Sequence, residues 1–340
     1  MLLKATGMAN VQTVVLARVN RNPGLNEIDR MKAGGTAKQR DCFPVQLFCH
    51  AEYYNDVPIV ESERDERSPQ LSANFLMDHI NAEQRRLVVN FLIRVGMHCR
   101  YPSHIVYESV KLFDAVMDKV SVNIEFIQMT ALASLWVALK RQENFHKIPT
   151  ATMLTSHAKE LYVGKEHLLL EYERKVLDAV NFNVTFANPF TLLAYHLIRC
   201  KSYLNLSDHK TALLYNCGSY LIDLTLLDEQ FCRTSINLIV LTITELVFGL
   251  VLDALLSRPR WLYWRGFLAV AVPHLIGRYE DKQIDQTRII LLRRLSDSNG
   301  KVHSFDVVYK KYNRTRYGGI SKYLLERTIR IFNTEALFDA

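Results

Sequence analysis

Residues 126–144, FIQMTALASLWVALKRQEN, decide how the chain folds. Apolar side chains cover this segment on almost every helical face, and small residues such as Ala131 let neighbouring helices approach closely. A helix that is apolar all round is enclosed by other helices or by a membrane. This one contains Gln128 and ends in charge at Lys140 and Arg141. The sequence therefore predicts the central helix of a helical bundle, with a charged corner at its end.

Amphipathic helices are predicted on both sides of this central segment. Apolar residues recur at helical spacing after Asn81, and Asn81 with Gln84 fits a capping box. Further helices are predicted over residues 103–120, 149–161 and 165–180. Five helices with the apolar one in the middle make a compact all-α unit.

The same arrangement then repeats in the second half of the chain. Helices are predicted over residues 188–200, 211–227, 235–256, 258–271 and 283–295. The low content of Gly (13) and Pro (9) in 340 residues also favours long helices over a turn-rich β protein. We expect a flexible arm over 1–45 and then a first repeat over 46–187. The first repeat is expected to begin with an entry helix at Pro44–Asn55, followed by a surface connection over 57–72. A second repeat is expected over 188–296, and a C-terminal helix and tail over 297–340.

The second apolar segment, 235–256, is long enough to span a membrane. However, Glu245 lies in its middle and Asp253 near its end, and each is costly at membrane depth. The segment also occupies the place in its repeat that 126–144 occupies in the first. We therefore expect a buried core helix, in which Glu245 reaches a hydrogen-bond donor on a neighbouring helix, and no membrane partner.

Composition narrows the class of protein. Hydrophobic residues make up 49% of the chain and charged residues 23%, which excludes a disordered or fibrous protein. The net charge of +7 is compatible with nucleic acid, but the basic residues are scattered among 35 acidic ones, so a partner with an acidic face explains the charge equally well. The six cysteines form no CxxC pair and no secretory leader precedes them, so they are expected to be buried thiols of a reducing compartment.

No motif of catalysis or cofactor binding is found in the sequence. A glycine-rich phosphate loop after a strand is absent. His50, His98 and His146 have no partner ligand three or four residues away. No Ser/His/Asp or Cys/His set can be chosen without arbitrariness. The sequence therefore predicts a protein that is not an enzyme and that holds no metal or cofactor.

Several segments together resemble the cyclin family. The resemblance rests on QRRLVVNFLIRVG (84–96), LFDAVMDKVSV (112–122), residues 128–143, LEYERKVLDAVNFNV (170–184), CGSYLIDLTLLDEQF (217–231) and YKKYNRTRYGGIS (309–321). These segments follow one another in the family's order and spacing from about Asn74 to Ser321. The chain is similar to a divergent cyclin of the A/B, mitotic type. The resemblance implies two tandem five-helix cyclin boxes.

The resemblance also implies a function and a binding site. A cyclin binds and activates a cyclin-dependent serine/threonine kinase in cell-cycle control, and such proteins act in the nucleus and cytoplasm. Kinase-contacting positions of the family match Lys140, Glu173, Val137, Leu177 and Val184, and Arg141 stands where the family has an aromatic residue. From spacing alone, Lys140 and Glu173 are better explained as residues that merely solvate helix ends, and it is the family match that favours contact residues.

Two further sets of residues match the family. Arg85 and Asp114 match an internal ion pair that ties the first helix to the second. The groove that docks Arg-x-Leu substrates and inhibitors corresponds to Gln84, Leu87, Val88, Phe91, Arg94 and Gln128. Arg94 replaces the acidic residue that meets the arginine of the peptide, so this docking is expected to be weak or altered.

Three alternatives stay open from the sequence. The first is a transcription-type cyclin-fold adaptor that binds a kinase or binds DNA and polymerase, although the mitotic-type segment 309–321 argues against it. The second is a membrane-associated helical protein that uses residues 235–256. The third is a scaffold that has lost kinase binding, which the substitution at Arg141 and the altered docking groove would permit. Nucleic acid is the less expected partner.

Overall fold

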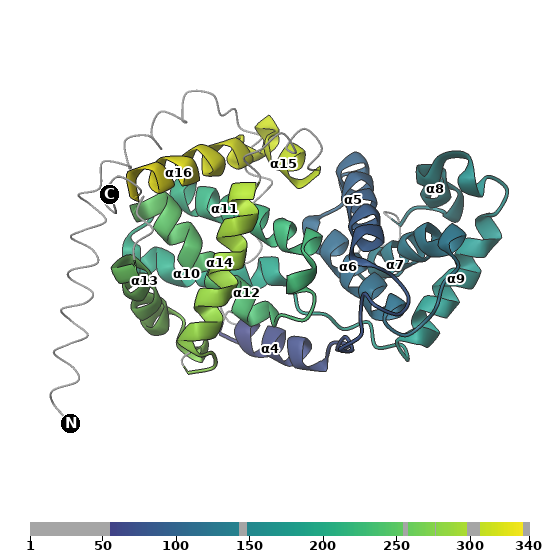
Figure 1. The fold of residues 1–340 in the computed structure, drawn as a ribbon, viewed down its shortest axis with the longest axis horizontal. Coiled ribbons are helices and arrows are strands. Elements are labelled where there is room, and N and C mark those ends of the chain that lie inside the picture. Colours follow the sequence, from purple (N-terminus) through teal and green to yellow (C-terminus); the bar gives the residue numbers. More distant parts are fainter. Residues whose placement is uncertain (1–54, 143–147, 254–257, 276, 298–306, 336–340) are drawn as a thin grey trace. The chain divides into compact units, whose positions relative to one another are not determined.

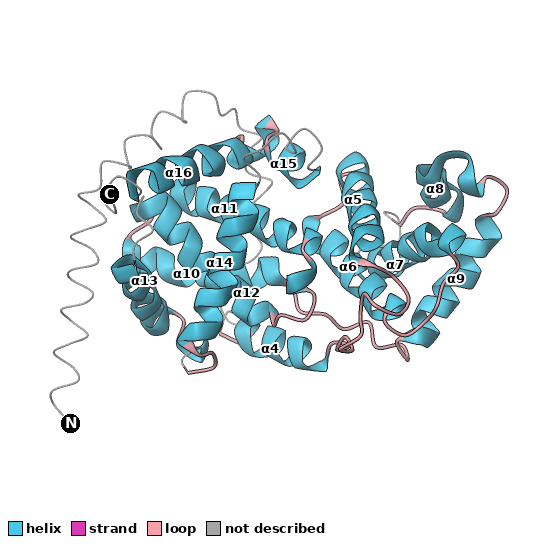
Figure 2. Cartoon of the chain, in the orientation of Figure 1, coloured by secondary structure: helices cyan, strands magenta, loops and turns pink. Residues whose placement is uncertain are grey.

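A computed structural model describes residues 55–142, 148–253, 258–275, 277–297 and 307–335. Every regular element in these ranges is helical (Figure 2), so the all-α prediction is confirmed. The chain divides into two compact units. The first unit comprises Glu61–Asn188 and Asp223–Ser235. The second comprises Pro189–Ile222, the described residues from Ile236 to 335, and the described residues 55–60. The predicted arm over 1–45 and nearly all of the predicted entry helix lie outside the described residues.

The first unit is built around helix α7 (Figure 1). Its elements are α4 (Val57–Arg67, of which Glu61–Arg67 belongs here), α5 (Ala82–Cys99), α6 (Ser103–Met117), η4 (Ile124–Phe126), α7 (Ile127–Gln142), α8 (Ala151–Thr155), η6 (Ser156–Tyr162) and α9 (Glu166–Ala179). Helix α7 packs against α5, α6, α8 and α9, and its residues from Met129 to Leu139 are all buried. The central helix predicted from residues 126–144 is thus confirmed.

Local sequence sets both the start of α5 and its distance from α6. The Asn81 side chain accepts a hydrogen bond from the Gln84 amide, and the Gln84 side chain accepts one from the Asn81 amide. This is the predicted capping box, and it satisfies two amides that a helix start leaves unpaired. Further along α5, a Cβ added at Gly96 would lie 2.5 Å from Cγ2 of Val106. Only glycine therefore permits this close approach of the two helices.

The prediction of a surface connection over 57–72 is wrong, because Val57–Arg67 forms helix α4. The buried carboxylate of Glu61 accepts a hydrogen bond of 2.6 Å from the Asn188 amide. The side-chain amide of Asn183 donates to the carbonyl of Arg67 at 2.8 Å. The helix is thus held partly through polar groups, and apolar periodicity does not reveal such a helix.

The second unit repeats the arrangement around α12. Its elements are α10 (Pro189–Leu204), α11 (Asp208–Leu227), α12 (Ile236–Val247), the π-helical turn η8 (Phe248–Asp253), α13 (Arg258–Ala271), η9 (Pro273–Leu275), α14 (Asp281–Asp297), α15 (Val307–Tyr312), η11 (Thr315–Tyr317) and α16 (Ile320–Glu335). Helix α12 packs against α10, α13 and α14. The end of α11, from Asp223, and the short η7 (Glu229–Phe231) belong to the first unit.

The stretch Ile236–Asp253 is long and apolar enough to cross a membrane, but 94% of it is buried inside the protein. Glu245, in the middle of α12, is fully buried and reaches two guanidinium groups. Its carboxylate lies 2.8 Å from Arg288 and 3.3 Å from Arg265. The prediction that this carboxylate finds donors on neighbouring helices is confirmed, and the stretch is a core helix of its unit.

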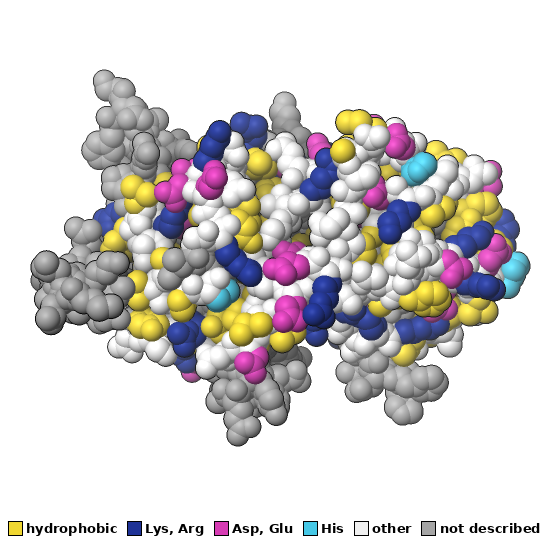
Figure 3. Space-filling model, turned by 90° about the horizontal axis from the view of Figure 1, so that it is seen from below, with side chains coloured by type: hydrophobic (Ala, Val, Ile, Leu, Met, Phe, Trp, Pro, Cys, Tyr) yellow, Lys and Arg dark blue, Asp and Glu magenta, His cyan; other side chains and the backbone are white. Residues whose placement is uncertain are grey.

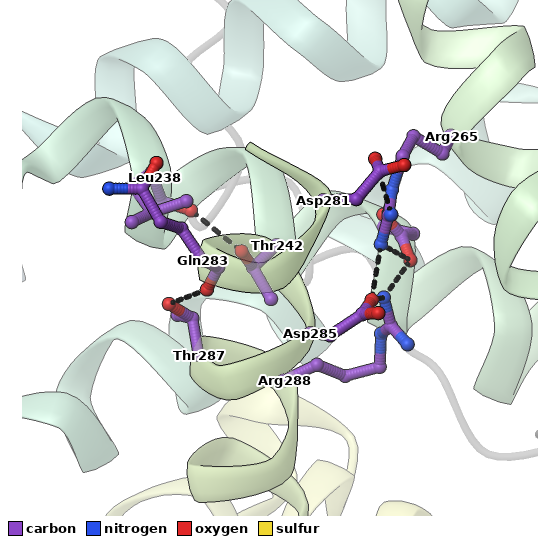
Figure 4. Close-up of polar contacts among 9 residues, drawn as sticks. Leu238, Thr242, Arg265, Asp281, Gln283, Asp285, Thr287 and Arg288 are labelled. Carbon is purple, nitrogen blue, oxygen red and sulfur yellow. Dashed lines mark hydrogen bonds and ion pairs between the residues drawn. The ribbon is translucent and has the colours of Figure 1, made fainter. Parts of the chain in front are cut away.

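The two arginines that bind Glu245 also form ion pairs with exposed carboxylates. Arg265 lies 2.7 Å from Asp281 and 2.7 Å from Asp285, and Arg288 lies 2.6 Å from Asp285. Figure 4 shows the four side chains converging from α13 and α14. The buried charge of Glu245 is therefore neutralised inside a network that extends outward to solvent.

Candidate functional site

The charged end of α7 meets α9 through one ion pair. The Nζ atom of Lys140 lies 2.6 Å and 2.8 Å from the two carboxylate oxygens of Glu173. The same Nζ atom lies 3.6 Å from the centre of the Trp136 ring. The side chains are 38% and 16% exposed, so both remain accessible to a partner. The structure thus brings together Lys140 and Glu173 of the predicted kinase-binding set.

Apolar side chains on α9 flank this pair. Leu170, Glu173 and Leu177 follow one another at spacings of three and four residues, which places them on one face of the helix. Leu170 is 55% exposed and Leu177 is half-buried. Val184, beyond the end of α9, is also half-buried, whereas Val137 on α7 is buried. The exposed apolar surface at this corner is therefore supplied by α9 and the turn that follows it.

Phe182 belongs to this corner but was missed among the predicted contact residues. It is 66% exposed, which is unusual for a phenylalanine. Asn181 and Phe182 both adopt the left-handed conformation, with φ values of 49° and 58°. The amide of Phe182 donates to the carbonyl of Leu177 and so terminates α9. The asparagine at 181 was the available signal, since asparagine tolerates this conformation at a helix end.

Arg141 is held inside the first unit. Its Nε lies 2.8 Å from Oε1 of Glu108 on α6, and its NH1 group donates to the carbonyl of Val184. The other carboxylate oxygen of Glu108 accepts a hydrogen bond of 2.9 Å from the Gln142 side chain. Burial raises the pKa of Glu108, and the nearby Arg141 guanidinium opposes that rise. The guanidinium that stands where the family has an aromatic residue is thus partnered by a buried carboxylate.

Arg85 and Asp114 form a buried, bidentate ion pair. Nε and NH2 of Arg85 each lie 2.8 Å from one oxygen of Asp114, and the side chains are 3% and 1% exposed. The remaining NH1 donates to the carbonyl of Leu226 at 2.9 Å. Burial would lower the pKa of Arg85, but the Asp114 charge outweighs it and raises the pKa. The pair joins α5 to α6 and to the end of α11.

The predicted docking groove lies along one face of α5. Its positions on this helix are Gln84, Leu87, Val88, Phe91 and Arg94, and Gln128 stands at the start of the adjacent α7. Leu87 is 65% exposed, Arg94 is exposed, and the other four are half-buried. The Gln84 side chain is engaged in the capping box. The face thus presents an apolar centre with a cation at one end.

The structure brings Cys99 close to two histidines, His98 and His157. Sγ of Cys99 lies 3.1 Å from Nε2 of His157, and the His98 ring lies 5.7 Å from the ring of His157. No group of three or more His, Cys, Asp or Glu suited to a metal ion occurs among the residues that the structure describes. The cysteines at 200, 217 and 232 are buried as expected, whereas Cys99 is partly exposed. His50 and His146 lie outside the described ranges.

Comparison with known proteins identifies the relatives of this chain. Residues 59–185 match the family model of the cyclin N-terminal domain. The G2/mitotic-specific cyclin cig1 of Schizosaccharomyces pombe is 24% identical over 239 residues, which cover 70% of this chain and 51% of that protein. The G2/mitotic-specific cyclin-B of Hydra vulgaris is 24% identical over 275 residues, which cover 80% and 68%. The chain thus spans about half the length of the first of these relatives.

A solved structure shows that the fold is shared as well. The X-ray structure of a viral cyclin from herpesvirus saimiri matches with a TM-score of 0.51 at 14% sequence identity. The match covers 71% of this chain and 98% of the viral protein. At this identity the likeness concerns the arrangement of helices.

Proposed function

Because this chain is a divergent cyclin of the A/B type, we propose that it is a non-catalytic regulatory subunit that binds and activates a cyclin-dependent serine/threonine kinase in cell-cycle control. The catalytic residues belong to the kinase. Kinase activity requires a Lys–Glu ion pair and a metal site that depend on the position of the regulatory helix. A subunit that binds the active arrangement more tightly shifts the population toward it. We place this activity in the nucleus and cytoplasm.

The observation that carries the proposal is the exposed corner formed by α7, α9 and the turn after α9. It combines the Lys140–Glu173 pair with the exposed apolar side chains of Leu170 and Phe182. Interfaces characteristically place a few apolar and aromatic side chains beside directed polar groups. In the complex, Lys140 would donate to backbone carbonyls of the kinase and Glu173 would accept from backbone amides, because these are the hydrogen bonds that each group can make.

The charge distribution favours a protein partner over nucleic acid. On the face drawn in Figure 3, the described basic side chains are interspersed with acidic ones and form no continuous basic surface. Nucleic-acid binding relies on clustered Lys and Arg that neutralise phosphates. A kinase with a mixed polar and apolar surface fits this pattern better.

The test is co-purification of the full chain with a panel of cyclin-dependent kinases, followed by a histone-type kinase assay. The variant carries Lys140→Ala and Glu173→Ala together, and we expect it to lose both association and activation. The matched control is Glu171→Ala with Lys175→Ala, an exposed ion pair of 2.7 Å within α9. The control removes the same two residue types from α9 and should bind the kinase as the unmodified chain does.

Two results would contradict the proposal. If the Lys140→Ala/Glu173→Ala variant binds at full strength, the corner is not the kinase interface. If the unmodified chain associates with no kinase in the panel, the result would favour a function as a kinase-independent scaffold.

We also propose that the α5 groove recruits Arg-x-Leu substrates or inhibitors only weakly. Arg94 lies where the arginine of such a peptide would meet an acidic residue, and two cations repel. The variant Arg94→Glu should bind an Arg-x-Leu peptide more tightly than the unmodified chain in a fluorescence-anisotropy titration, and a peptide with Ala in place of Arg should show no gain. An equal gain for both peptides would contradict the assignment of Arg94.

A further inference from the structure

We propose that the Glu108–Arg141 ion pair positions the turn of residues 181–184, so that Phe182 is presented to the kinase as an aromatic contact. Arg141 is then a positioning residue that acts through Phe182. This inference rests on the proposed kinase partner, and it assigns a role to a substitution that would otherwise only weaken the interface.

The turn needs support from outside because its backbone is unfavourable. Two consecutive residues other than glycine, Asn181 and Phe182, have left-handed φ values. A bulky residue in this conformation is uncommon, and such backbone persists only where the surroundings fix it. Exposing two-thirds of the Phe182 side chain adds a second unfavourable term, because the ring is left in water. A costly conformation that displays an aromatic ring indicates a contact made with another molecule.

Three sets of hydrogen bonds hold the turn in place. Within it, the amides of Asn181 and Phe182 donate to carbonyls at the end of α9. On one side, the Asn183 side chain donates to the carbonyl of Arg67 at 2.8 Å, which ties the turn to α4. On the other side, Arg141 donates to the carbonyl of Val184. Residues on both sides of the turn thus limit its movement.

The Arg141 contact is itself anchored in the interior of the unit. Glu108 projects from α6 with a side chain that is 9% exposed, and it receives Arg141 at 2.8 Å and Gln142 at 2.9 Å. A guanidinium carries five N–H donors in a rigid plane, so one arginine can bind a carboxylate and a backbone carbonyl together. The cyclin motif would place an aromatic side chain at this position. A phenylalanine has no donor and a tyrosine has a single O–H, so neither could donate to the Glu108 carboxylate and the Val184 carbonyl together.

A double-mutant cycle tests whether Arg141 acts through Phe182. Kinase affinity is measured for the full chain and for the variants Arg141→Met, Phe182→Ala and the two combined. Loss of a buried aromatic contact is expected to weaken binding about 30-fold, and Arg141→Met about tenfold. If Arg141 only presents Phe182, the combined variant should be no weaker than Phe182→Ala alone.

A stability effect must be separated from a positioning effect. Arg141→Met leaves Glu108 with fewer partners, so the variant Glu108→Met/Arg141→Met, which removes both charges, is measured in parallel. The control is Arg174→Met, which breaks an exposed ion pair with Asp178 on α9. Amide hydrogen exchange in the free chain should be faster over residues 181–185 in both Arg141 variants and unchanged in the control. Maximal kinase activity at saturating cyclin should stay the same in the Arg174→Met control.

Each outcome decides the matter. Affinity losses that add in the combined variant, or an Arg141→Met variant that binds the kinase normally, would overturn the positioning role while leaving the proposed function intact. An unmodified chain that binds no kinase would overturn the proposed function and the positioning role together. Non-additive losses with faster exchange of the turn are the expected result.

Discussion

Helix α7 of the first unit and helix α12 of the second are both enclosed by neighbouring helices, yet their charged residues lie in different places. Helix α7 keeps its charges at its end, where Lys140 remains accessible together with its partner Glu173 on α9. Helix α12 carries Glu245 in its buried middle, where Arg265 and Arg288 neutralise it. The first arrangement leaves charge available to a partner, and the second uses charge within its own unit. Stability should therefore depend on the inner charges and binding on the outer ones.

The largest expected effect tests this distinction inside the first unit. The variant Arg85→Ala leaves Asp114 buried without its guanidinium partner, which costs about 3–5 kcal/mol of unfolding free energy. Denaturant unfolding measures the loss, and kinase activation should fall with it. The control Arg86→Ala changes an exposed arginine of the same helix and should have little effect. Weaker kinase binding without any loss of stability would show that Arg85 belongs to the interface.

Glu245 provides the corresponding test in the second unit. The variant Glu245→Ala removes the carboxylate that faces two guanidinium groups and should lower the unfolding free energy by about 3 kcal/mol. Asp281 is 73% exposed and binds the same Arg265, so Asp281→Ala should cost less than about 1 kcal/mol. Equal losses of unfolding free energy in the two variants would show that buried and exposed charges contribute equally to stability.

The buried histidine His196, which contacts α12, makes the stability of the second unit depend on pH. His196 is fully buried, with Nδ1 3.2 Å from the Thr244 hydroxyl, and burial followed by the nearby His274 lowers its pKa to about 3. Its neutral form is thus favoured in the fold, so its contribution to stability is complete above the unfolded pKa near 6.5 and is lost as the pH falls toward 3.

Between pH 6.5 and 5.5 this one proton should lower the unfolding free energy by about 1 kcal/mol. The variant His196→Asn should show a shallower loss over the same range. An unchanged slope in His196→Asn would mean that other groups, such as His274, whose pKa burial lowers to about 4, account for the acid sensitivity.

The smallest expected effect on stability belongs to the residues with the largest expected effect on binding. The Lys140→Ala/Glu173→Ala variant should change the unfolding free energy by less than about 1 kcal/mol, because the pair is partly exposed. Thermal unfolding of the free chain measures this. A loss as large as that of Arg85→Ala would mean that the corner is a structural element, and the binding result could then not be interpreted as an interface effect.

Much of the fold was predictable because it depends on local patterns. Helical periodicity predicted the ten helices of the two repeats. The capping box of Asn81 and Gln84 can be recognised from a segment of four residues. The position of Glu245 was also informative, since a carboxylate in an apolar core helix requires donors. These features follow from short segments and from the cost of burying polar groups.

What the sequence did not reveal depends on residues far apart in the chain. Helix α4 is held by the hydrogen bond from the Asn188 amide to the Glu61 carboxylate, and these two residues are 127 positions apart in the sequence. The Glu108–Arg141 pair likewise depends on how α6 packs against α7. The exposure of Phe182 follows from a backbone conformation that side-chain type alone would not suggest for phenylalanine. Long-range polar contacts and unusual backbone therefore account for the features of the candidate site that the sequence did not predict.

The first unit is discontinuous, and this has a consequence for the order of folding during synthesis. Residues 223–235 complete it, with Arg85 bound to the carbonyl of Leu226 and Lys111 bound to the carbonyl of Cys232. A ribosome that has just released residue 188 from its tunnel has supplied every helix of the first repeat but not these acceptors. The nascent chain must wait for the following segment before the Arg85 guanidinium is fully satisfied. Chaperone contact during that interval is expected to concentrate on α5 and α6.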